Sequence, residues 1–364
     1  MDMVSDIEEL VTCESPSTDL AAVAASADVV ARVGTRRLGV EPERIVLDGR
    51  THLRWRFGDG PARVLVLGHH DTVWPLGTLA THPFAVTDDV MRGPGCFDMK
   101  AGVVMAFHAI ARLADRSGVT VLITGDEEIG SPSSRALIEA EAQGCVAALV
   151  LEASADGGAL KTARKGGSWY TVRAHGLAAH AGLEPERGVN VTVELAHQIL
   201  AMTELGDDAL GTTVTPTLLS AGTTTNTVPA VGEVMVDARA RTVAEQKRVD
   251  AAMRALEPVL DGAKLEILGG PNRPPLETSA SADLFARAST VAAKLGLPPL
   301  TSTAVGGASD GNFTAGMGIP TLDGLGAVGG GAHAADEHVL VPELPGRTDL
   351  LVALIADLLA GTAK

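Results

Sequence analysis

In the first half of the chain, short apolar runs alternate with longer segments of helical periodicity. Three runs are typical of buried strands: residues 63–71, 119–125 and 147–153. Two segments between them have the periodicity of helices: residues 99–115 and 131–142. Ser131 followed by Pro132 also predicts a helix start, with the serine as N-cap and the proline at the first helical position. This alternation favours an α/β fold with a mostly parallel sheet and helices on both faces.

A different pattern begins at about residue 167 and indicates a second, smaller module. A strand-like segment, SWYTVRAHG, comes first, and the helical segment after it carries Val191, Leu195, Ile199 and Met202 on one face. Two further strand-like segments, a second helix and a closing strand complete the order β-α-β-β-α-β, the ferredoxin-like split βαβ arrangement. A module of about 110 residues is an ordinary domain size.

After the proline-rich stretch at 269–277, the larger domain resumes. Residues 282–296 have a helical pattern, and residues 347–361 form an amphipathic segment typical of a terminal helix. We therefore expect residues 1–166 and 277–364 to form one domain, with residues 167–276 inserted into it.

Composition and charge argue against several classes of protein. The 364 residues carry a formal net charge of −16 without a local Lys/Arg cluster, which argues against a nucleic-acid partner. No apolar run approaches the roughly 18 residues of a membrane helix, and the opening segment MDMVSDIEEL lacks the basic region of a secretory signal. Cys13, Cys96 and Cys145 are odd in number and lack CxxC spacing, so we expect reduced thiols. These features predict a soluble cytoplasmic protein without a membrane partner.

Polar residues follow each of the three predicted strands of the larger domain. In an open parallel sheet, ligands bind outside the carboxyl ends of the strands, so these side chains are expected to converge. They are His69, Asp71, Glu127, Glu128 and Glu152. Two loops add further candidates: Asp98 lies in GPGCFDMK, just before a helix, and His333 lies in the glycine-rich GGGAHAADEH.

Two histidines and several carboxylates that converge in this way suit a pair of zinc ions. Zinc binds imidazole nitrogen and carboxylate oxygen, and paired metal ions lie about 3.5 to 4 Å apart. One of the adjacent residues Glu127 and Glu128 can then bind metal while the other acts as general base towards water. Alternatively, both glutamates merely flank the N-terminus of the next helix, where negative charge is favoured.

Strand alternation separates the two adjacent histidines. His69 and Asp71 fall on one face and His70 on the other, which favours His69 as the ligand. Asp71 is then placed to hydrogen-bond the ligating imidazole and fix its tautomer. His108 lies within a predicted helix and is expected to be a core or surface histidine.

Six segments, taken together, resemble the dinuclear zinc carboxypeptidases and amidohydrolases. That family includes glutamate carboxypeptidase, aminoacylase, acetylornithine deacetylase and succinyl-diaminopimelate desuccinylase. The segments are LGHHDTVWP, GPGCFDMKAG, TGDEEIGSPSSR, LVLEAS, AHGLAAHAG and GAHAADEHV. The resemblance runs along essentially the whole chain in the family's order, and DEEIGSPSSR is most similar to the glutamate carboxypeptidase branch.

The resemblance implies a metal centre of two zinc ions per subunit, for which cobalt or manganese can substitute. Asp98 would bridge both ions, Glu127 would be the general base and proton shuttle, and Asp71 would support a ligating histidine. The implied metal ligands are His69, Asp98, Glu128, Glu152 and His333.

The resemblance also implies roles for three residues of the second module, which would be a dimerisation and lid domain. His180 would reach across a homodimer interface to stabilise the tetrahedral oxyanion. Asn226 and Arg273 match positions that contact the substrate, including its carboxylate, for which a guanidinium fork is suited. The structural alternative is a turn amide for Asn226 and a loop salt bridge for Arg273.

The activity implied by the family is hydrolysis of an amide or peptide bond adjacent to a free carboxylate, through a zinc-bridging hydroxide. The substrate would be a small peptide or N-acyl amino acid, and glutamate or a related amino acid would be released, as by a carboxypeptidase. The alternative is an N-acyl amino acid deacylase of the acetylornithine deacetylase or desuccinylase type. A binding or scaffold protein descended from such enzymes is disfavoured, because Glu127 and all five implied ligands are present.

Two positions depart from the family's pattern. Met99 stands where many relatives have a second aspartate, and Ala153 follows Glu152 where proline is common. Neither change removes a ligand, but both weaken any transfer of fine substrate preference. The family also implies a cis peptide bond between Asp98 and Met99, although a non-proline cis bond costs about 2.5 to 4 kcal/mol.

Overall fold

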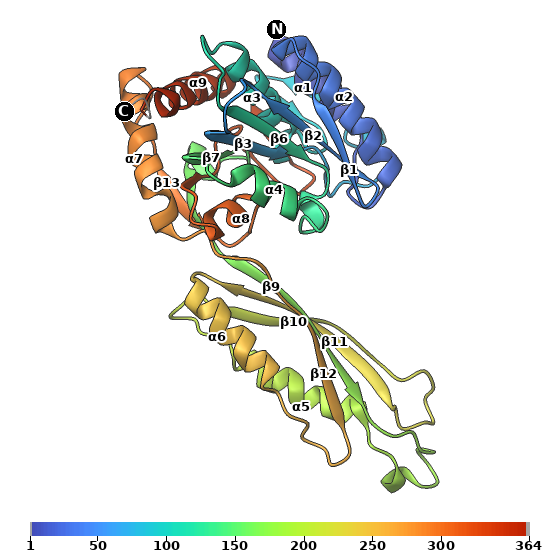
Figure 1. Ribbon diagram of the computed structural model, residues 1–364. Helices are drawn as coiled ribbons and strands as arrows, with labels where there is room; N and C mark the ends of the chain where they lie inside the picture. The colour runs from blue at the N-terminus through green and yellow to red at the C-terminus, as the bar shows by residue number, and fades with distance from the viewer. Residues whose placement is uncertain (1, 362–364) are drawn as a thin grey trace. The chain divides into compact units, whose positions relative to one another are not determined.

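The computed structural model describes residues 2–361, which form two compact units (Figure 1). Unit 1 comprises the described residues up to Ala163, Leu276–Val305 and those from Ser309 onward. Unit 2 comprises Arg164–Pro275 and the short segment Gly306–Ala308. Unit 2 is therefore inserted into the sequence of unit 1.

Unit 1 is built around a six-stranded sheet whose central strands are parallel. Strands β6, β3, β7 and β14 pair in parallel, while β1 and β2 add an antiparallel hairpin at the β6 edge. In spatial order the strands are β1 (Glu43–Leu47), β2 (Arg50–Arg56), β6 (Val119–Thr124), β3 (Val64–His69), β7 (Ala147–Val150) and β14 (Thr321–Leu322). The predicted mostly parallel sheet is confirmed.

Helices cover both faces of this sheet (Figure 1). Side chains of β3 alternate between two clusters: Val64 and Val66 pack with α1, α2, α3, α7 and α9, whereas Leu65 and Leu67 pack with α4 and α8. Burial on both sides explains why this strand is an uninterrupted apolar run. The helices are α1 (Asp2–Val11), α2 (Leu20–Leu38), α3 (Ala101–Ala111), α4 (Arg135–Ala142), α7 (Thr278–Lys294), α8 (Gly311–Gly316) and α9 (Leu344–Ala360).

The predicted helix start at Ser131 and Pro132 is wrong, because α4 begins at Arg135. Ser131 has a left-handed backbone with φ of 57°, and its hydroxyl donates to Asp310 instead of capping a helix. The hydroxyls of Ser133 and Ser134 donate to the buried carboxylate of Asp126, at 2.6 and 2.5 Å. The serine hydroxyls therefore donate to the carboxylates of Asp126 and Asp310 and do not cap a helix as local propensity predicts.

Short strands add two small sheets that the sequence pattern did not predict. One joins β8 (Leu160–Arg164) to β13 (Ser302–Val305). The other is antiparallel and has the spatial order β15 (Gly329–Gly330), β16 (His338–Leu340), β5 (Val90–Arg92) and β4 (Ala85–Thr87). It brings the segment before residue 98 beside the glycine-rich segment that carries His333.

Unit 2 has the predicted order β-α-β-β-α-β. Its four strands form an antiparallel sheet in the order β10, β11, β9, β12. Val191, Leu195 and Met202 of α5 and Val249 and Met253 of α6 pack on one face of that sheet. The elements are β9 (Gly166–His175), α5 (Val191–Thr203), β10 (Thr213–Ala221), β11 (Val231–Ala240), α6 (Val243–Arg254) and β12 (Lys264–Arg273).

Two expectations about the cysteines and the membrane can be compared with the described chain. Cys13, Cys96 and Cys145 are free thiols, as their odd number and spacing predicted. Within residues 2–361, no helix combines the length and apolar character needed to cross a membrane.

Candidate metal centre

The parallel pairing in unit 1 places the ends of three strands along one edge of the sheet. His69, the last residue of β3, lies opposite Thr124, the last residue of β6. Glu127 begins a helical turn three residues beyond the end of β6, and Glu152 lies two residues beyond the end of β7. The turn ends well before α4, so the adjacent glutamates do not flank that helix's N-terminus. The edge is thus lined with carboxylates around one imidazole.

Asp98 lies between the two histidines of this edge. Its Oδ1 is 3.4 Å from His69 Nε2, and its Oδ2 is 3.3 Å from His333 Nε2. Glu152 Oε1 is 3.6 Å from the same His69 nitrogen, and Glu128 Oε2 is 3.2 Å from the His333 nitrogen. The structure therefore brings all five sequence-predicted ligands together, with one aspartate spanning two nitrogen donors.

Several buried atoms at this site lack a hydrogen bond. They are His69 Nε2, Asp98 Oδ1 and Glu128 Oε1. Leaving a buried polar atom unsatisfied costs about 1–3 kcal/mol, so such atoms in one place call for a ligand. Two overlapping groups have ligand atoms within 4.8 Å of one another: His69, Glu127 and Glu152, and His69, Asp98 and Glu128. Imidazole nitrogens and carboxylate oxygens are a donor set that fits zinc.

The carboxylates strongly perturb the two imidazoles. Hydrogen bonds with Asp98 and Glu128 raise the pKa of His333 to about 10. Burial alone would lower the pKa of His69, but the carboxylates around it outweigh burial and hold that pKa well above its ordinary value. The site thus has a strong affinity for positive charge, which protons or metal ions can supply.

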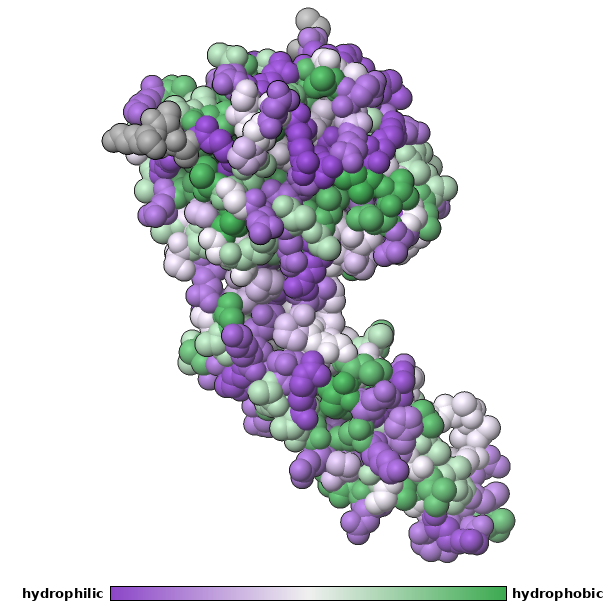
Figure 2. All heavy atoms as spheres, in the orientation of Figure 1, coloured by the Kyte–Doolittle hydropathy of each residue, from purple (hydrophilic) through white to green (hydrophobic). Residues whose placement is uncertain are grey.

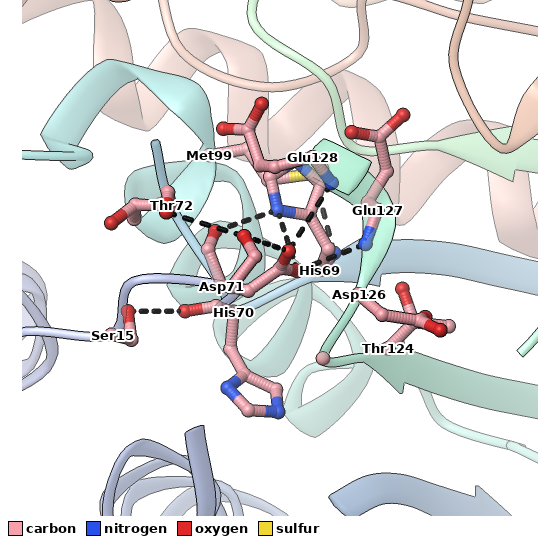
Figure 3. A network of polar contacts seen from close by, with 12 residues as sticks. Ser15, His69, His70, Asp71, Thr72, Met99, Thr124, Asp126, Glu127 and Glu128 are labelled. Atoms are coloured by element: carbon pink, nitrogen blue, oxygen red, sulfur yellow. Dashed lines mark hydrogen bonds and ion pairs between the residues drawn. The ribbon is translucent and has the colours of Figure 1, made fainter. Parts of the chain in front are cut away.

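Asp71 supports both the histidine and the adjacent glutamates (Figure 3). Its carboxylate accepts the backbone N–H groups of Glu127 and Glu128, each at 3.2 Å, and the hydroxyl of Ser17 at 2.6 Å. His69 Nδ1 lies 2.9 Å from the backbone oxygen of Asp71 and 3.5 Å from its carboxylate. The backbone carbonyl therefore holds the ring so that Nε2 faces Asp98, while the carboxylate positions the glutamate turn.

His70 and His108 lie outside the centre. The ring of His70 points away from that of His69 (Figure 3), with its nitrogens 3.2 Å from Ser26 Oγ and 3.0 Å from the Thr51 carbonyl. Burial lowers the pKa of His70 to about 4. His108 Nε2 lies 2.7 Å from Asp6, a residue of α1. The geometry agrees with the alternation that separates His69 from His70.

The loop that carries Asp98 is constrained by its neighbours. Gly95 has φ of 72°, and a Cβ there would lie 2.5 Å from Thr72 Cγ2, so the position requires glycine. The Asp98–Met99 peptide bond is cis, as the family resemblance implied. The sulfur of Met99 accepts the His69 backbone N–H at 3.3 Å.

Sequence reasoning missed two buried carboxylates beneath the centre. Asp126 accepts the Ser133 backbone N–H at 2.8 Å as well as the two serine hydroxyls, and thereby fixes the loop that carries both glutamates. Glu337 accepts the backbone N–H of Asp98 at 3.1 Å. The sequence signal for Asp126 was its position next to Glu127, and the signal for Glu337 was its position four residues after His333 in a glycine-rich loop.

The three predicted functional residues of unit 2 fall at two places. His180 is exposed. The next residue, Ala181, donates its backbone N–H to the Asn226 carbonyl at 2.9 Å, so the segments of His180 and Asn226 lie side by side. Arg273 is buried at the end of β12 opposite Gly167, whereas the other end of β12 lies opposite His175. The structure brings His180 and Asn226 together and leaves Arg273 at the far end of the strand pair.

Comparisons with known proteins show which family and which relatives this chain is similar to. The family model described as Peptidase family M20/M25/M40 matches residues 65–357. Carboxypeptidase G2 from Pseudomonas sp. strain RS-16 is 30% identical over 99% of this chain and 90% of its own length. Succinyl-diaminopimelate desuccinylase from Methylococcus capsulatus is 26% identical over 88% of this chain and 90% of its own length.

Solved structures share the fold over nearly all of the chain. Aminopeptidase PepT from Bacillus cereus superposes with a TM-score of 0.72 at 24% identity, over 98% of both chains. An M20 family metallo-carboxypeptidase from Sulfolobus solfataricus superposes with a TM-score of 0.74 at 17% identity, over 98% of this chain and 99% of that one. At these identities the likeness concerns the fold.

Proposed function

Because the chain belongs to peptidase family M20/M25/M40, we propose that it hydrolyses an amide or peptide bond adjacent to a free carboxylate, as a carboxypeptidase with two zinc ions per subunit. The family makes the chain a metal-dependent hydrolase. The observation that carries the proposal is the position of Asp98, whose two oxygens lie 3.4 and 3.3 Å from the Nε2 atoms of His69 and His333. A carboxylate that spans two imidazoles in this way is suited to bridge two cations.

The distances divide the ligands into two sets that share Asp98. His69 lies near its Oδ1 and also near Glu152, whereas His333 lies near its Oδ2 and also near Glu128. Divalent cations held there would polarise the scissile carbonyl and lower the pKa of a water molecule. The residues that hold them keep the carbonyl carbon and the water in reach of one another.

Glu127 is the general base in this proposal. Glu127 is buried, with 6% exposure, near the carboxyl ends of the parallel strands, and its backbone N–H donates to the Asp71 carboxylate. Its carboxylate takes the proton from the attacking water and delivers it to the leaving amine. Glu128, its neighbour, is instead 3.2 Å from His333, which supports different tasks for the two adjacent glutamates.

Unit 2 supplies substrate contacts in this proposal. His180 Nδ1 accepts the Gly182 N–H at 3.1 Å, so the neutral ring carries its hydrogen on Nε2, where it can donate to an oxyanion. Asn226 lies on the adjoining segment, and the guanidinium of Arg273 is suited to the free carboxylate of the substrate.

We further propose a homodimer through unit 2, with His180 acting in the partner's site. Strand β10 is an edge strand of the sheet, and its Leu218 and Leu219 are 65% and 53% exposed. Hydrophobic surface lies among hydrophilic residues on unit 2 (Figure 2). An edge of this kind favours pairing with another strand.

The second candidate is an N-acyl amino acid deacylase. The similarity to succinyl-diaminopimelate desuccinylase, 26% over 88% of the chain, supports it. The same metal ligands and the same base serve both reactions, so the groups that contact the acyl moiety and the released amino acid decide between them.

The test is hydrolysis of a matched panel by zinc-loaded protein, with and without chelator. The panel contains N-acyl-glutamates, short dipeptides, N-acetylornithine and N-succinyl-diaminopimelate. Chelator-sensitive release of C-terminal glutamate is expected. Cleavage restricted to the last two substrates would favour the deacylase, and no cleavage of any substrate with two zinc ions bound would contradict the proposed substrate class.

A further inference from the structure

Glu337 is a buried carboxylate whose four acceptor positions are all used. Its Oε1 accepts the backbone N–H groups of Phe97 and Asp98, at 2.9 and 3.1 Å. Its Oε2 accepts the backbone N–H of Gly95 at 2.9 Å and the indole N–H of Trp74 at 2.7 Å. The side chain is 3% exposed. An ionised carboxylate offers about four acceptor sites, so this one is saturated by the chain alone.

The small antiparallel sheet places Glu337 beneath the Asp98 loop. Glu337 directly precedes β16, in which His338 lies opposite Arg92 of β5. The chain leaves β5 and enters the turn that contains Gly95 and Asp98, so the paired strands set the carboxylate against that turn. His333 lies four residues before Glu337 in the same loop.

We propose that Glu337 is a positioning residue for the metal centre, which fastens the backbone of Asp98 to the loop that carries His333. Glu337 accepts three backbone hydrogen bonds from residues 239 to 242 positions earlier in the chain and so links the two segments that carry the proposed ligands Asp98 and His333. Asp98 needs both of its oxygens aimed at different histidines, so a small rotation of its backbone would misplace one of them. The inference rests on the proposed function through the identity of the ligands.

A glutamine at this position cannot replace the glutamate. Its amide oxygen can accept two of the four donors, but its NH₂ group would face the other two N–H groups. The Glu337→Gln variant therefore preserves shape and volume while it breaks about half of the four hydrogen bonds that Glu337 accepts. The expected effect is on the geometry and affinity of the metal centre.

Unit 2 offers a matched control. Glu194 is also fully buried, with 0% exposure, and accepts backbone N–H groups from Val259 and Leu260, at 3.0 and 2.8 Å. The side chain of Gln198 gives it a further N–H donor at 2.7 Å. Glu194→Gln makes the same chemical change in a carboxylate that fastens a loop of unit 2, which contains none of the proposed metal ligands.

The experiment measures zinc affinity of the full chain by competition with a chromophoric chelator, together with the visible spectrum of the cobalt-loaded protein and the Tm of the metal-free protein. For Glu337→Gln we expect zinc to bind about 10- to 100-fold more weakly, the usual cost of losing a group that orients a ligand, and an altered cobalt spectrum. For Glu194→Gln we expect a lower Tm with zinc affinity and cobalt spectrum unchanged.

A second variant keeps the test decisive if Glu337→Gln does not fold. Trp74→Phe removes one donor to Glu337 and leaves the backbone intact, so zinc should bind about two- to ten-fold more weakly, as expected for one hydrogen bond. The inference would be overturned, and the proposed function would stand, if the unsubstituted protein binds zinc tightly and both folded variants keep the same zinc affinity and cobalt spectrum. Failure of the unsubstituted protein to bind zinc would overturn the proposed function and the inference with it.

Discussion

Buried carboxylates differ in their hydrogen bonding between the metal centre of unit 1 and the core of unit 2. At the centre, His69, Asp98 and Glu128 each bury an atom that makes no hydrogen bond. In unit 2, both oxygens of Glu194 accept N–H groups of the chain, and the amide of Gln246 donates to the Arg273 carbonyl at 2.8 Å. A buried group that the chain satisfies fixes a loop, whereas one that it leaves unsatisfied is available to a ligand.

The difference predicts that activity and stability can be altered separately. Substitutions among the unsatisfied groups should affect metal binding and turnover. Substitutions in the core of unit 2 should affect the free energy of unfolding. Four experiments test this separation, beginning with the largest expected effect.

Glu127→Gln is expected to lower kcat by about 10²- to 10⁴-fold, the usual contribution of general acid–base catalysis. Glu127 is the proposed base and not one of the five proposed ligands, so the variant should still bind two zinc ions and unfold at a similar temperature. Steady-state hydrolysis, zinc content and thermal unfolding of the same preparation provide the check. Retention of more than about a tenth of the activity would remove Glu127 from the role of base.

Leu195→Ala is the complementary change in unit 2. Leu195 is fully buried between α5 and the sheet, and removal of its side chain should lower the free energy of unfolding by about 2–5 kcal/mol. Urea unfolding measures the loss, and chelator competition measures zinc affinity below the transition. A large fall in zinc affinity of the folded variant would contradict the separation between the two units.

Much of the fold could be predicted from the sequence, since the central strands β3, β6 and β7 of unit 1 are mostly apolar runs and β3 is buried on both faces. Alternation also separates His69 from His70, because side chains of a strand point to opposite faces whatever the tertiary structure. The split βαβ order of unit 2 follows from two amphipathic helices between strand patterns. These features depend on local periodicity, which the sequence contains.

The features that escaped prediction depend on distant partners. Local propensity favours Ser131 as a helix cap, but its hydroxyl donates to the carboxylate of Asp310, which is far away in the sequence. Glu337 is significant only through donors about 240 residues earlier in the chain, at Gly95 to Asp98. Strands of two or three residues, such as β15 and β16, are too short for a periodic pattern. No sequence window contains both members of such a contact.

Zinc removal should destabilise unit 1 selectively. A ligand that binds only the folded state stabilises it by about 2.7 kcal/mol at 100 times its Kd. Hydrogen exchange measured with zinc and after chelation should therefore show faster exchange around Asp98, Glu127 and His333 in the metal-free protein. Exchange in α5 and α6 of unit 2 should change little. Equal acceleration in both units would show that the centre stabilises the chain as one cooperative body.

The smallest expected effect concerns a satisfied carboxylate of unit 1 away from the centre. Asp6 is 2% exposed and lies 2.8 Å from Arg36, 2.5 Å from Arg37 and 2.7 Å from His108. Burial would raise the pKa of Asp6, but hydrogen bonds from these three partners outweigh burial and lower it. Asp6 in unit 1 thus resembles Glu194 in unit 2, because the chain itself supplies its partners.

A lowered pKa in the folded state means that ionised Asp6 stabilises the protein at pH values above its ordinary pKa, near 3.8. That stabilisation should be lost as the pH falls below this value through the folded-state pKa. Urea unfolding of the metal-free protein between neutral pH and pH 3, compared with Asp6→Asn, measures it: the difference between the two proteins should shrink towards acid. Because Asp6 contacts no proposed ligand, the difference in unfolding free energy between the unsubstituted protein and Asp6→Asn at neutral pH should be the same with and without zinc. A difference that depends on zinc would show that the centre and the helix α1 contacts are coupled.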